Sequence, residues 1–401
     1  MNSSTSGLAY RAAFGTSRLL VYAVALFASL RLGADGTANA AKFDDESLTH
    51  PLGAFGDVLF SPLARWDSVW YLGIAHDGYD GGADTAFFPL YPLLVRTLVL
   101  PHPSEAALIF AAYVVSLACF VGALYLLERL AELELGRTVA GTTVWLVALF
   151  PASLYFGAPY SESLFLLVSV GAFYAARKDS WAWAGALAAA ATATRSAGIV
   201  LLVPLVLLWL DSRPRRRGDL AWLALAPLGL AAYALHLEIE HGDAFAFVDA
   251  QEAWYRDFAG PFVGVWDGTT AAWDGVRQLV SGSRDRVYFE LAAGDPLRVA
   301  AINLLLFGFL VFAFVAVVGT FRRLPRAYGA YALAALALPL SYPVGPQPLM
   351  SLPRFLAVLF PLFMWLAVVS EERGRTMPVV AASAVGLGLF TTQFAAWEWI
   401  A

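Results

Sequence analysis

Long apolar runs separated by short polar segments recur from one end of this chain to the other. A helix needs roughly 20 apolar residues to cross a bilayer, within a range of about 17–25. The runs therefore predict about eleven transmembrane helices. The fifth is short and rich in Ala, so it is either buried among other helices or crosses only part of the bilayer. The predicted ranges are approximately 15–33, 106–127, 138–155, 162–177, 181–194, 197–211, 219–240, 299–320, 327–342, 354–370 and 377–394.

Two long polar segments, 34–105 and 241–298, interrupt this pattern. The basic runs RPRRR (213–217) and FRRLPR (321–326) fall together on the opposite side of the predicted membrane. Because cytoplasmic segments are enriched in Lys and Arg, this distribution places the N-terminus inside. It makes 34–105 the first extracytoplasmic loop and 241–298 the second.

The composition indicates a polytopic membrane protein rather than a soluble protein with one anchor. Of 401 residues, 59% are hydrophobic and 14% are charged, whereas soluble domains carry about 25% charged residues. The deficit extends along the whole chain, so we expect a single integral membrane domain over 1–401. The lone cysteine, Cys119, allows no intramolecular disulfide and no Cys-based zinc site.

The stretch RWDSVWYLGIAHDGYD (65–80) places acidic residues among aromatics in the first outer loop. Residues 66–76 predict a short helix with Asp67 and Tyr71 on one side and Trp66 and Trp70 on another. Such a helix is too short to span and suits the outer interface. The alternative is that Asp67 only faces water or caps a turn.

Three further charged residues fall at predicted outer helix ends. Glu162 lies in the first turn of its helix, where the helix dipole alone is one explanation for a negative charge. Arg195 and Arg354 lie in apolar surroundings near the outer leaflet, where they either snorkel or bind a partner. Because a guanidinium matches phosphate oxygens in pairs, the two arginines are candidates for holding a lipid phosphate.

Four stretches together resemble one protein family. RWDSVWYLGIAHDGY, FFPLYPLL, FPASLYFGAPYSESLFLL and ATRSAGIVLL occur in this order and resemble the PIG-V family and its prokaryotic relatives. The resemblance covers roughly residues 15–210 well and the remainder more loosely. FVDAQEAWYR (247–256) and LPRFLAVLFPLF (352–363) also resemble prokaryotic members, whereas the later loops do not obviously match the eukaryotic ones.

The resemblance implies an all-α polytopic membrane protein of the GT-C glycosyltransferase type, with short interfacial helices in its large first outer loop. It implies an inverting mannosyltransferase that moves mannose from a polyprenyl- or dolichyl-phosphate carrier to a lipid-linked or cell-surface glycan. The active site would face outward from a prokaryotic plasma membrane. The lipid-linked sugar is the co-substrate; besides it and membrane lipids, we expect no cofactor, metal or nucleic acid.

The resemblance also implies roles for individual residues. Asp67 matches the acidic residue expected to act as the base, and Arg195 and Arg354 would hold the donor phosphate. Substrate-binding candidates are Arg65, Trp66, Trp70, His76, Asp77, Tyr160, Glu162, Gln251 and Trp254. The alternative function is a lipid or glycolipid transporter or flippase, which would place ionisable groups near the bilayer midplane. A catalytically inactive relative that binds glycolipid is a third possibility.

Overall fold

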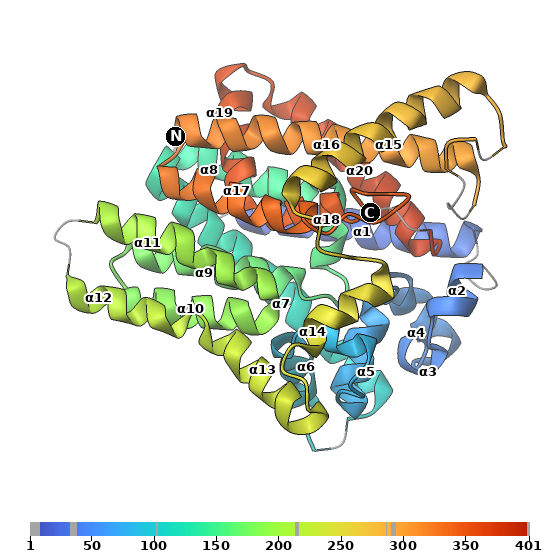
Figure 1. Ribbon diagram of the computed structural model, residues 1–401, viewed down its shortest axis with the longest axis horizontal. Helices are drawn as coiled ribbons and strands as arrows, with labels where there is room; N and C mark the ends of the chain where they lie inside the picture. Colours follow the sequence, from blue (N-terminus) through green and yellow to red (C-terminus); the bar gives the residue numbers. More distant parts are fainter. Residues whose placement is uncertain are drawn as a thin grey trace.

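The computed structural model describes residues 9–32, 38–101, 103–212, 216–285, 287–289 and 294–398. Within these ranges all regular structure is helical and no strand is present (Figure 1). Each of the eleven predicted ranges contains helix. The prediction of an all-α fold is therefore confirmed.

Among the described residues, five helical segments are long and apolar enough to cross a membrane alone, which confirms a multi-pass membrane protein. Large apolar side chains such as Phe27 and Leu389 are exposed on these helices, as expected for surfaces that face lipid. The number of crossings, eleven, stays a prediction. The five segments are Ala9–Arg31 in α1, Glu105–Leu135 (α7), Arg217–His241, Pro296–Arg323 (α16) and Thr376–Ala395 (α20).

The remaining predicted ranges hold shorter helices that pack among these five. They are α8 (Arg137–Leu149), α9 (Glu162–Arg177), α10 (Trp181–Thr194), η4 (Ser196–Leu201) with α11 (Leu202–Asp211), α17 (Arg326–Leu340), α18 (Leu352–Ala357) and α19 (Phe360–Glu372). The segment Arg217–His241 consists of α12 (Arg217–Trp222), η5 (Leu223–Leu225) and α13 (Leu228–His241).

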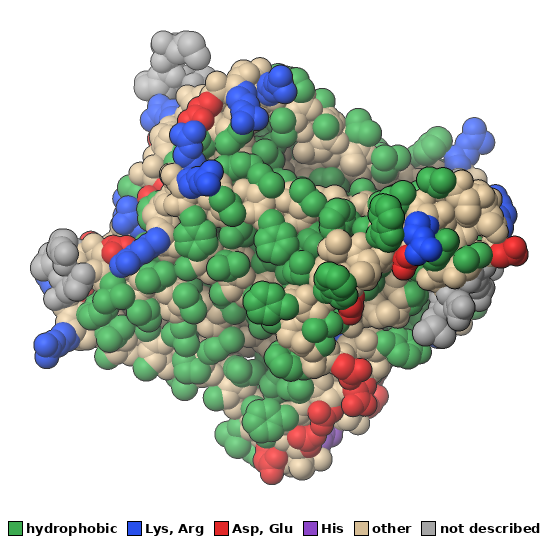
Figure 2. All heavy atoms as spheres, turned by 45° about the horizontal axis from the view of Figure 1, so that its top comes forward, with side chains coloured by type: hydrophobic (Ala, Val, Ile, Leu, Met, Phe, Trp, Pro, Cys, Tyr) green, Lys and Arg blue, Asp and Glu red, His purple; other side chains and the backbone are tan. Residues whose placement is uncertain are grey.

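Charge is distributed unevenly around the apolar surface. On the face shown in Figure 2, hydrophobic side chains cover the middle of the molecule. Lys and Arg lie mostly on the left of that view, with a few on the right, and the largest group of Asp and Glu lies at the bottom. The orientation indicated by the basic runs stays a prediction.

One predicted helix is broken, and this correction affects the site. The range 354–370 forms two helices, α18 and α19, with a break at Val358 and Leu359. Pro361 lies in the first turn of α19 and has no N–H to continue the α18 hydrogen-bond pattern. Arg354 therefore lies on its own short helix rather than at the end of a long one.

The segment 34–105, predicted to be the first outer loop, folds into short helices within its described residues, as predicted. They are α2 (Ala38–Phe43), α3 (Glu46–Thr49), α4 (Gly53–Phe60), η1 (Ser61–Leu63), α5 (Asp67–Asp77), η2 (Ala83–Ala86) and α6 (Leu90–Val99). The predicted helix 66–76 corresponds to α5. It begins after Trp66, which has φ of 59°, and ends at Gly78, which has φ of 95°.

The second outer loop contains more regular structure than the sequence indicated. It holds α14 (Ala246–Asp249), η6 (Ala250–Trp254) and the 21-residue helix α15 (Pro261–Ser281), which the sequence analysis did not predict. In Figure 1, α15 lies beside α16, and α14 lies in front of the α5 and α6 region.

Glycines hold α10 close to the segment that follows the α11–α12 connection. A Cβ atom on Gly185 would lie 2.0 Å from the carbonyl oxygen of Trp222, and one on Gly229 would lie 2.1 Å from that of Ala189. Small residues permit such close approach of helices in membranes. The contact fixes the C-terminal end of α10, where Arg195 follows.

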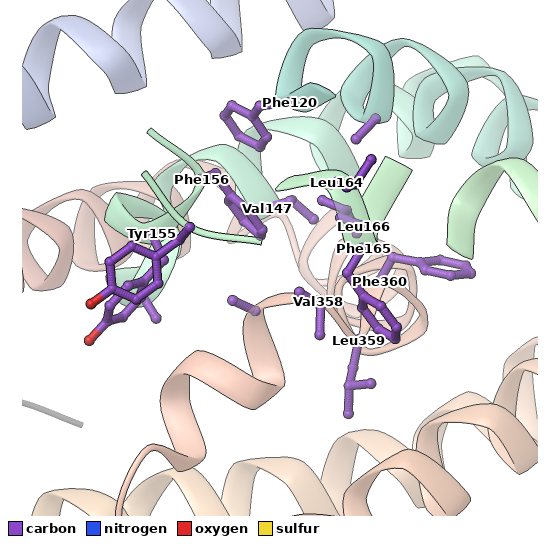
Figure 3. Packing of buried hydrophobic residues seen from close by; sticks show 14 of the residues in the cluster. Phe120, Val147, Tyr155, Phe156, Leu164, Phe165, Leu166, Val358, Leu359 and Phe360 are labelled. Carbon is purple, nitrogen blue, oxygen red and sulfur yellow. The ribbon is translucent and has the colours of Figure 1, made fainter. Parts of the chain in front are cut away.

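Buried apolar side chains join α9 to the break between α18 and α19. Leu164, Phe165 and Leu166 of α9 lie near Val358, Leu359 and Phe360 in Figure 3. All six residues are buried. This packing brings the N-terminus of α9 next to α18, so Glu162 and Arg354 meet although they are far apart in sequence.

Candidate active site

A cavity of about 430 Å³ opens between the outer-loop helices and the ends of the apolar helices. Four charged residues line it, namely Asp67, Arg195, Arg256 and Arg354. The rest of its wall is mostly apolar. Its apolar lining includes Phe87, Phe88, Phe165, Ile199, Leu230, Phe247, Leu338, Phe355, Val358 and Leu359.

Arg354 connects two carboxylates at the charged end of this cavity. Its Nη1 atom lies 2.5 Å from Oδ2 of Asp67, and its Nε donates to Oε1 of Glu162. The guanidinium also lies over the rings of Tyr160 and Tyr155, at 5.0 and 5.4 Å from their centroids. The ion pairs and the two rings together hold the guanidinium in place.

Arg195 makes a second ion pair with the same glutamate. Its Nη2 donates to Oε1 of Glu162, and its Nε donates to Oγ of Ser161 at 3.0 Å. Ser161 in turn shares a 2.7 Å hydrogen bond with the hydroxyl of Tyr71. Burial raises the pKa of Tyr71 to about 12, so this hydroxyl stays protonated at neutral pH.

Glu162 is fully buried and does not line the cavity. Removing a carboxylate from water costs several kcal/mol unless charged partners replace the solvent. Arg195 and Arg354 supply that replacement at Oε1, whereas Oε2 has no hydrogen-bond partner among the described residues. Glu162 therefore holds the two arginines in place, and a substrate-binding role for it stays a prediction.

Tyr160 positions Asp67 through the backbone. The N–H of Asp67 donates to the Tyr160 hydroxyl at 3.1 Å, and that hydroxyl donates to the carbonyl of Arg65 at 3.0 Å. The two bonds bracket Trp66, whose positive φ is uncommon for a non-glycine residue. Burial, followed by the nearby Asp67 carboxylate, raises the pKa of Tyr160 well above its ordinary value, so the hydroxyl remains a donor.

Two residues of the segment 241–298 complete the wall, and a substrate-binding role for them stays a prediction. Gln251 and Trp254, both in η6, line the cavity. Trp254 meets the ring of Trp70 edge-on at 5.9 Å between centroids. Trp70 does not line the cavity; it stacks on Phe87, at 5.7 Å, and closes the wall from behind.

Four further candidates lie away from the cavity. Arg65 and Trp66 are buried and pack on Trp397, with Arg65 5.2 Å and the Trp66 ring 5.3 Å from its centroid. His76 and Asp77 form a solvent-exposed pair, with 2.7 Å between Nδ1 and Oδ1. A substrate-binding role for these four stays a prediction.

Arg256 was not among the sequence candidates, although it ends the quoted stretch 247–256. It is half-buried, its Nη2 lies 3.4 Å from the carbonyl oxygen of Met350, and its guanidinium lies 5.6 Å from the ring centroid of Phe355. Burial, followed by the charge of Arg354, lowers its pKa to about 10. The available sequence signal was an arginine two positions after a tryptophan, at the end of the stretch FVDAQEAWYR.

The fold and the cavity together define a multi-pass helical membrane protein with an internal site suited to an amphiphile. The charged end suits an anionic head group and the apolar wall suits a hydrocarbon chain. No group of three or more His, Cys, Asp or Glu side chains placed to hold a metal ion occurs in the described part of the chain.

Residues 12–210 belong to the mannosyltransferase (PIG-V) family. The resemblance seen in the sequence is therefore confirmed, and this half of the chain belongs to a family of glycosyltransferases. It contributes Asp67, Glu162 and Arg195 to the site, whereas Arg256 and Arg354 come from outside the matched residues.

Individual relatives match over shorter stretches. GPI mannosyltransferase 2 of Chaetomium globosum is 28% identical over 179 residues, which is 40% of this chain and 38% of that protein. GPI alpha-1,6-mannosyltransferase 2 of Rattus norvegicus is 33% identical over 124 residues, or 29% of this chain and 25% of that protein. The chain thus matches well under half the length of these relatives.

Among solved structures, the chain is similar to the oligosaccharyltransferase of Archaeoglobus fulgidus crystallised with Zn and sulfate. The match has a TM-score of 0.46 and 14% identity, and covers 95% of this chain and 53% of that one. The same enzyme tethered to an acceptor peptide matches with the same TM-score and 12% identity. These values are too low to support a conclusion about function.

Proposed function

We propose that the chain is a mannosyltransferase that uses mannose linked to a polyprenyl or dolichyl phosphate and transfers it to a lipid-linked or cell-surface glycan. The observation that carries this proposal is the joining, in one cavity, of Asp67 and a group of arginines to a long apolar wall. The membership of residues 12–210 in the PIG-V family supports the type of sugar.

The cavity suits an amphiphilic donor in size and in polarity. Its volume of about 430 Å³ falls within the roughly 300–1,000 Å³ of ordinary ligand pockets. The phosphate would lie at the arginine end. The hydrocarbon chain would follow the apolar lining contributed by η4, α13 and α17, including Ile199, Leu230 and Leu338.

Asp67 is the general base in this proposal. Arg354 contacts one of its carboxylate oxygens, Oδ2, and the side chain lines the cavity. In the proposed step, Oδ1 accepts the proton of the acceptor hydroxyl while that oxygen attacks the anomeric carbon. The bond between that carbon and the phosphate oxygen breaks, and the electron pair leaves with the lipid phosphate. A single displacement of this kind inverts the configuration at the anomeric carbon.

The lipid phosphate gains negative charge as it leaves, so it needs electrostatic stabilisation more than protonation. Fixed guanidinium groups provide such stabilisation without reorganisation during the reaction. The lipid-linked sugar is the co-substrate in this scheme, and no step requires a further cofactor.

The orientation of the site is part of the proposal. The basic runs in the sequence support an extracytoplasmic location for the cavity. We place the protein in a prokaryotic plasma membrane because of the sequence resemblance to prokaryotic members. The relatives named above are eukaryotic, from a fungus and a rodent.

The test uses purified protein in lipid nanodiscs with polyprenyl-phosphate mannose as donor and a panel of glycolipid acceptors. We expect release of polyprenyl phosphate together with a mannosylated product. Asp67→Asn keeps size and polarity but loses the base, so turnover should fall by about 10²–10⁴-fold. Asp80→Asn is the matched control, since Asp80 is exposed and does not line the cavity. Normal turnover by Asp67→Asn would remove the base assignment, and absence of transfer by the wild-type protein from any polyprenyl-phosphate mannose would refute the function.

A further inference from the structure

Arg256 is the arginine of the cavity that has no carboxylate partner. Within the described residues, no Asp or Glu oxygen lies within 4.0 Å of its guanidinium, whereas Arg195 and Arg354 both bind Glu162 and Arg354 also binds Asp67. The Asp67 carboxylate raises the pKa of Arg256 by less than burial lowers it. A half-buried charge that no carboxylate contacts is costly unless a ligand balances it. Resting on the function proposed above, we propose that Arg256 binds the phosphate of the lipid-linked donor and of the lipid phosphate product.

The contacts of Arg256 hold it without neutralising it. The carbonyl of Met350 accepts from Nη2 at 3.4 Å, a long hydrogen bond, and the Phe355 ring lies 5.6 Å below the guanidinium. Met350 and Phe355 themselves line the cavity. The side chain is therefore fixed at the wall, and most of its five N–H donors remain for an anion.

The backbone turns so that Arg256 and Trp254 face the same cavity. Tyr255, which separates them, adopts a left-handed conformation with φ of 56° and ψ of 39°. Tyr255 itself is exposed, while both of its neighbours line the cavity. This conformation is uncommon for a tyrosine. Here it lets the Trp254 ring and the Arg256 guanidinium, both from one short segment, line the cavity.

The balance of charge at the site favours an anionic ligand. Three guanidiniums, those of Arg195, Arg256 and Arg354, meet two carboxylates, those of Asp67 and Glu162. The excess of one positive charge equals the single negative charge of a phosphodiester donor. When the sugar leaves, the phosphate becomes a monoester and gains a second negative charge. Arg256 would then stabilise the leaving group, and the ion pairs of Arg195 and Arg354 with Glu162 and Asp67 would remain intact.

This inference divides the roles of the arginines differently from the sequence analysis. The main role of Arg195 and Arg354 is to hold Glu162 and Asp67 in place, and Arg256 binds the donor phosphate. Replacing Arg256 should therefore weaken phosphate binding while the hydrogen bonds around Asp67 are kept.

The test measures equilibrium binding to the protein in nanodiscs, without turnover. The probes are a polyprenyl monophosphate and the neutral polyprenol of the same chain length. Arg256→Gln should weaken binding of the phosphate by about 10- to 100-fold, the range for a lost charged hydrogen bond, and leave polyprenol binding unchanged. Arg256→Lys should recover part of the affinity because it keeps the charge but not the planar arrangement of donors. Arg277→Gln is the control, since Arg277 is an exposed arginine of the same outer loop and pairs with Asp274.

Unchanged phosphate binding by Arg256→Gln would overturn the inference. Equal losses for the phosphate and for polyprenol would overturn it as well, because they indicate damage to the cavity. If wild-type protein binds the phosphate through Arg256 but transfers no mannose, the inference stands and the proposed function fails. If wild-type protein transfers mannose but its phosphate binding does not depend on Arg256, the proposed function stands and the inference fails.

Discussion

Replacing Glu162 by Gln tests whether the buried ion-pair cluster of Asp67, Glu162, Arg195 and Arg354 stabilises the protein. Glu162 is fully buried, and the side chains of Arg195 and Arg354 are 14% and 10% exposed. Losing the shared carboxylate leaves both guanidiniums without their common partner in a poorly solvated place. Breaking a buried pair by removing one partner costs about 3–5 kcal/mol. We expect a loss in this range, moderated because Arg354 keeps Asp67.

The assay is thermal unfolding in nanodiscs, followed by tryptophan fluorescence at a fixed scan rate. A loss of this size should lower the apparent Tm by several degrees. Glu372→Gln is the matched control, because Glu372 pairs with Arg323 at the surface and both side chains are 49% exposed. An exposed pair contributes about 0–1 kcal/mol, so the control should change little. Equal shifts for the two variants, or none for Glu162→Gln, would refute the reasoning.

A double-mutant cycle measures the coupling within the cluster. Adding Arg195→Gln to Glu162→Gln removes one of the charges left unpaired. The double variant should therefore be less destabilised than the sum of the two single variants. Additive losses would mean that Glu162 and Arg195 stabilise the protein independently of one another.

Two further predictions concern helix packing and topology. Gly185→Ala should destabilise the protein by about 1–3 kcal/mol, because its Cβ would lie 2.0 Å from the Trp222 carbonyl oxygen. Gly308→Ala, where a Cβ meets nothing within 4 Å, should be neutral or stabilising in the same unfolding assay. Similar effects at both glycines would contradict the packing argument. In a Cys119→Ser background, an impermeant thiol reagent applied to intact cells should label Glu46→Cys and not Arg217→Cys. The reverse labelling would place the cavity on the cytoplasmic side.

Much of the helical organisation could be predicted because it depends on local sequence. Apolar runs of the required length indicated each helix range, and the basic runs indicated the orientation. The helical period placed Asp67 and Tyr71 on one side of a short helix, and both line the cavity of the structure. The helix α15 was missed because its apolar residues are interrupted by Asp267, Asp274 and Arg277, which lowers its hydropathy below that of a spanning run.

The partners of the charged residues could not be predicted in the same way. Sequence alone identified Asp67, Glu162, Arg195 and Arg354 as unusual charges near one membrane face, since a charge in an apolar segment is costly wherever that segment folds. Only the tertiary structure decided which of them neutralise one another. Arg354 reaches Glu162 across 192 positions of the chain, and this contact depends on the packing of α9 against the break at Val358 and Leu359. Among the described residues, Arg256 lies beside the cluster without a carboxylate within 4.0 Å. The sequence could not indicate this, because helix periodicity carries no information about distances between segments far apart in sequence.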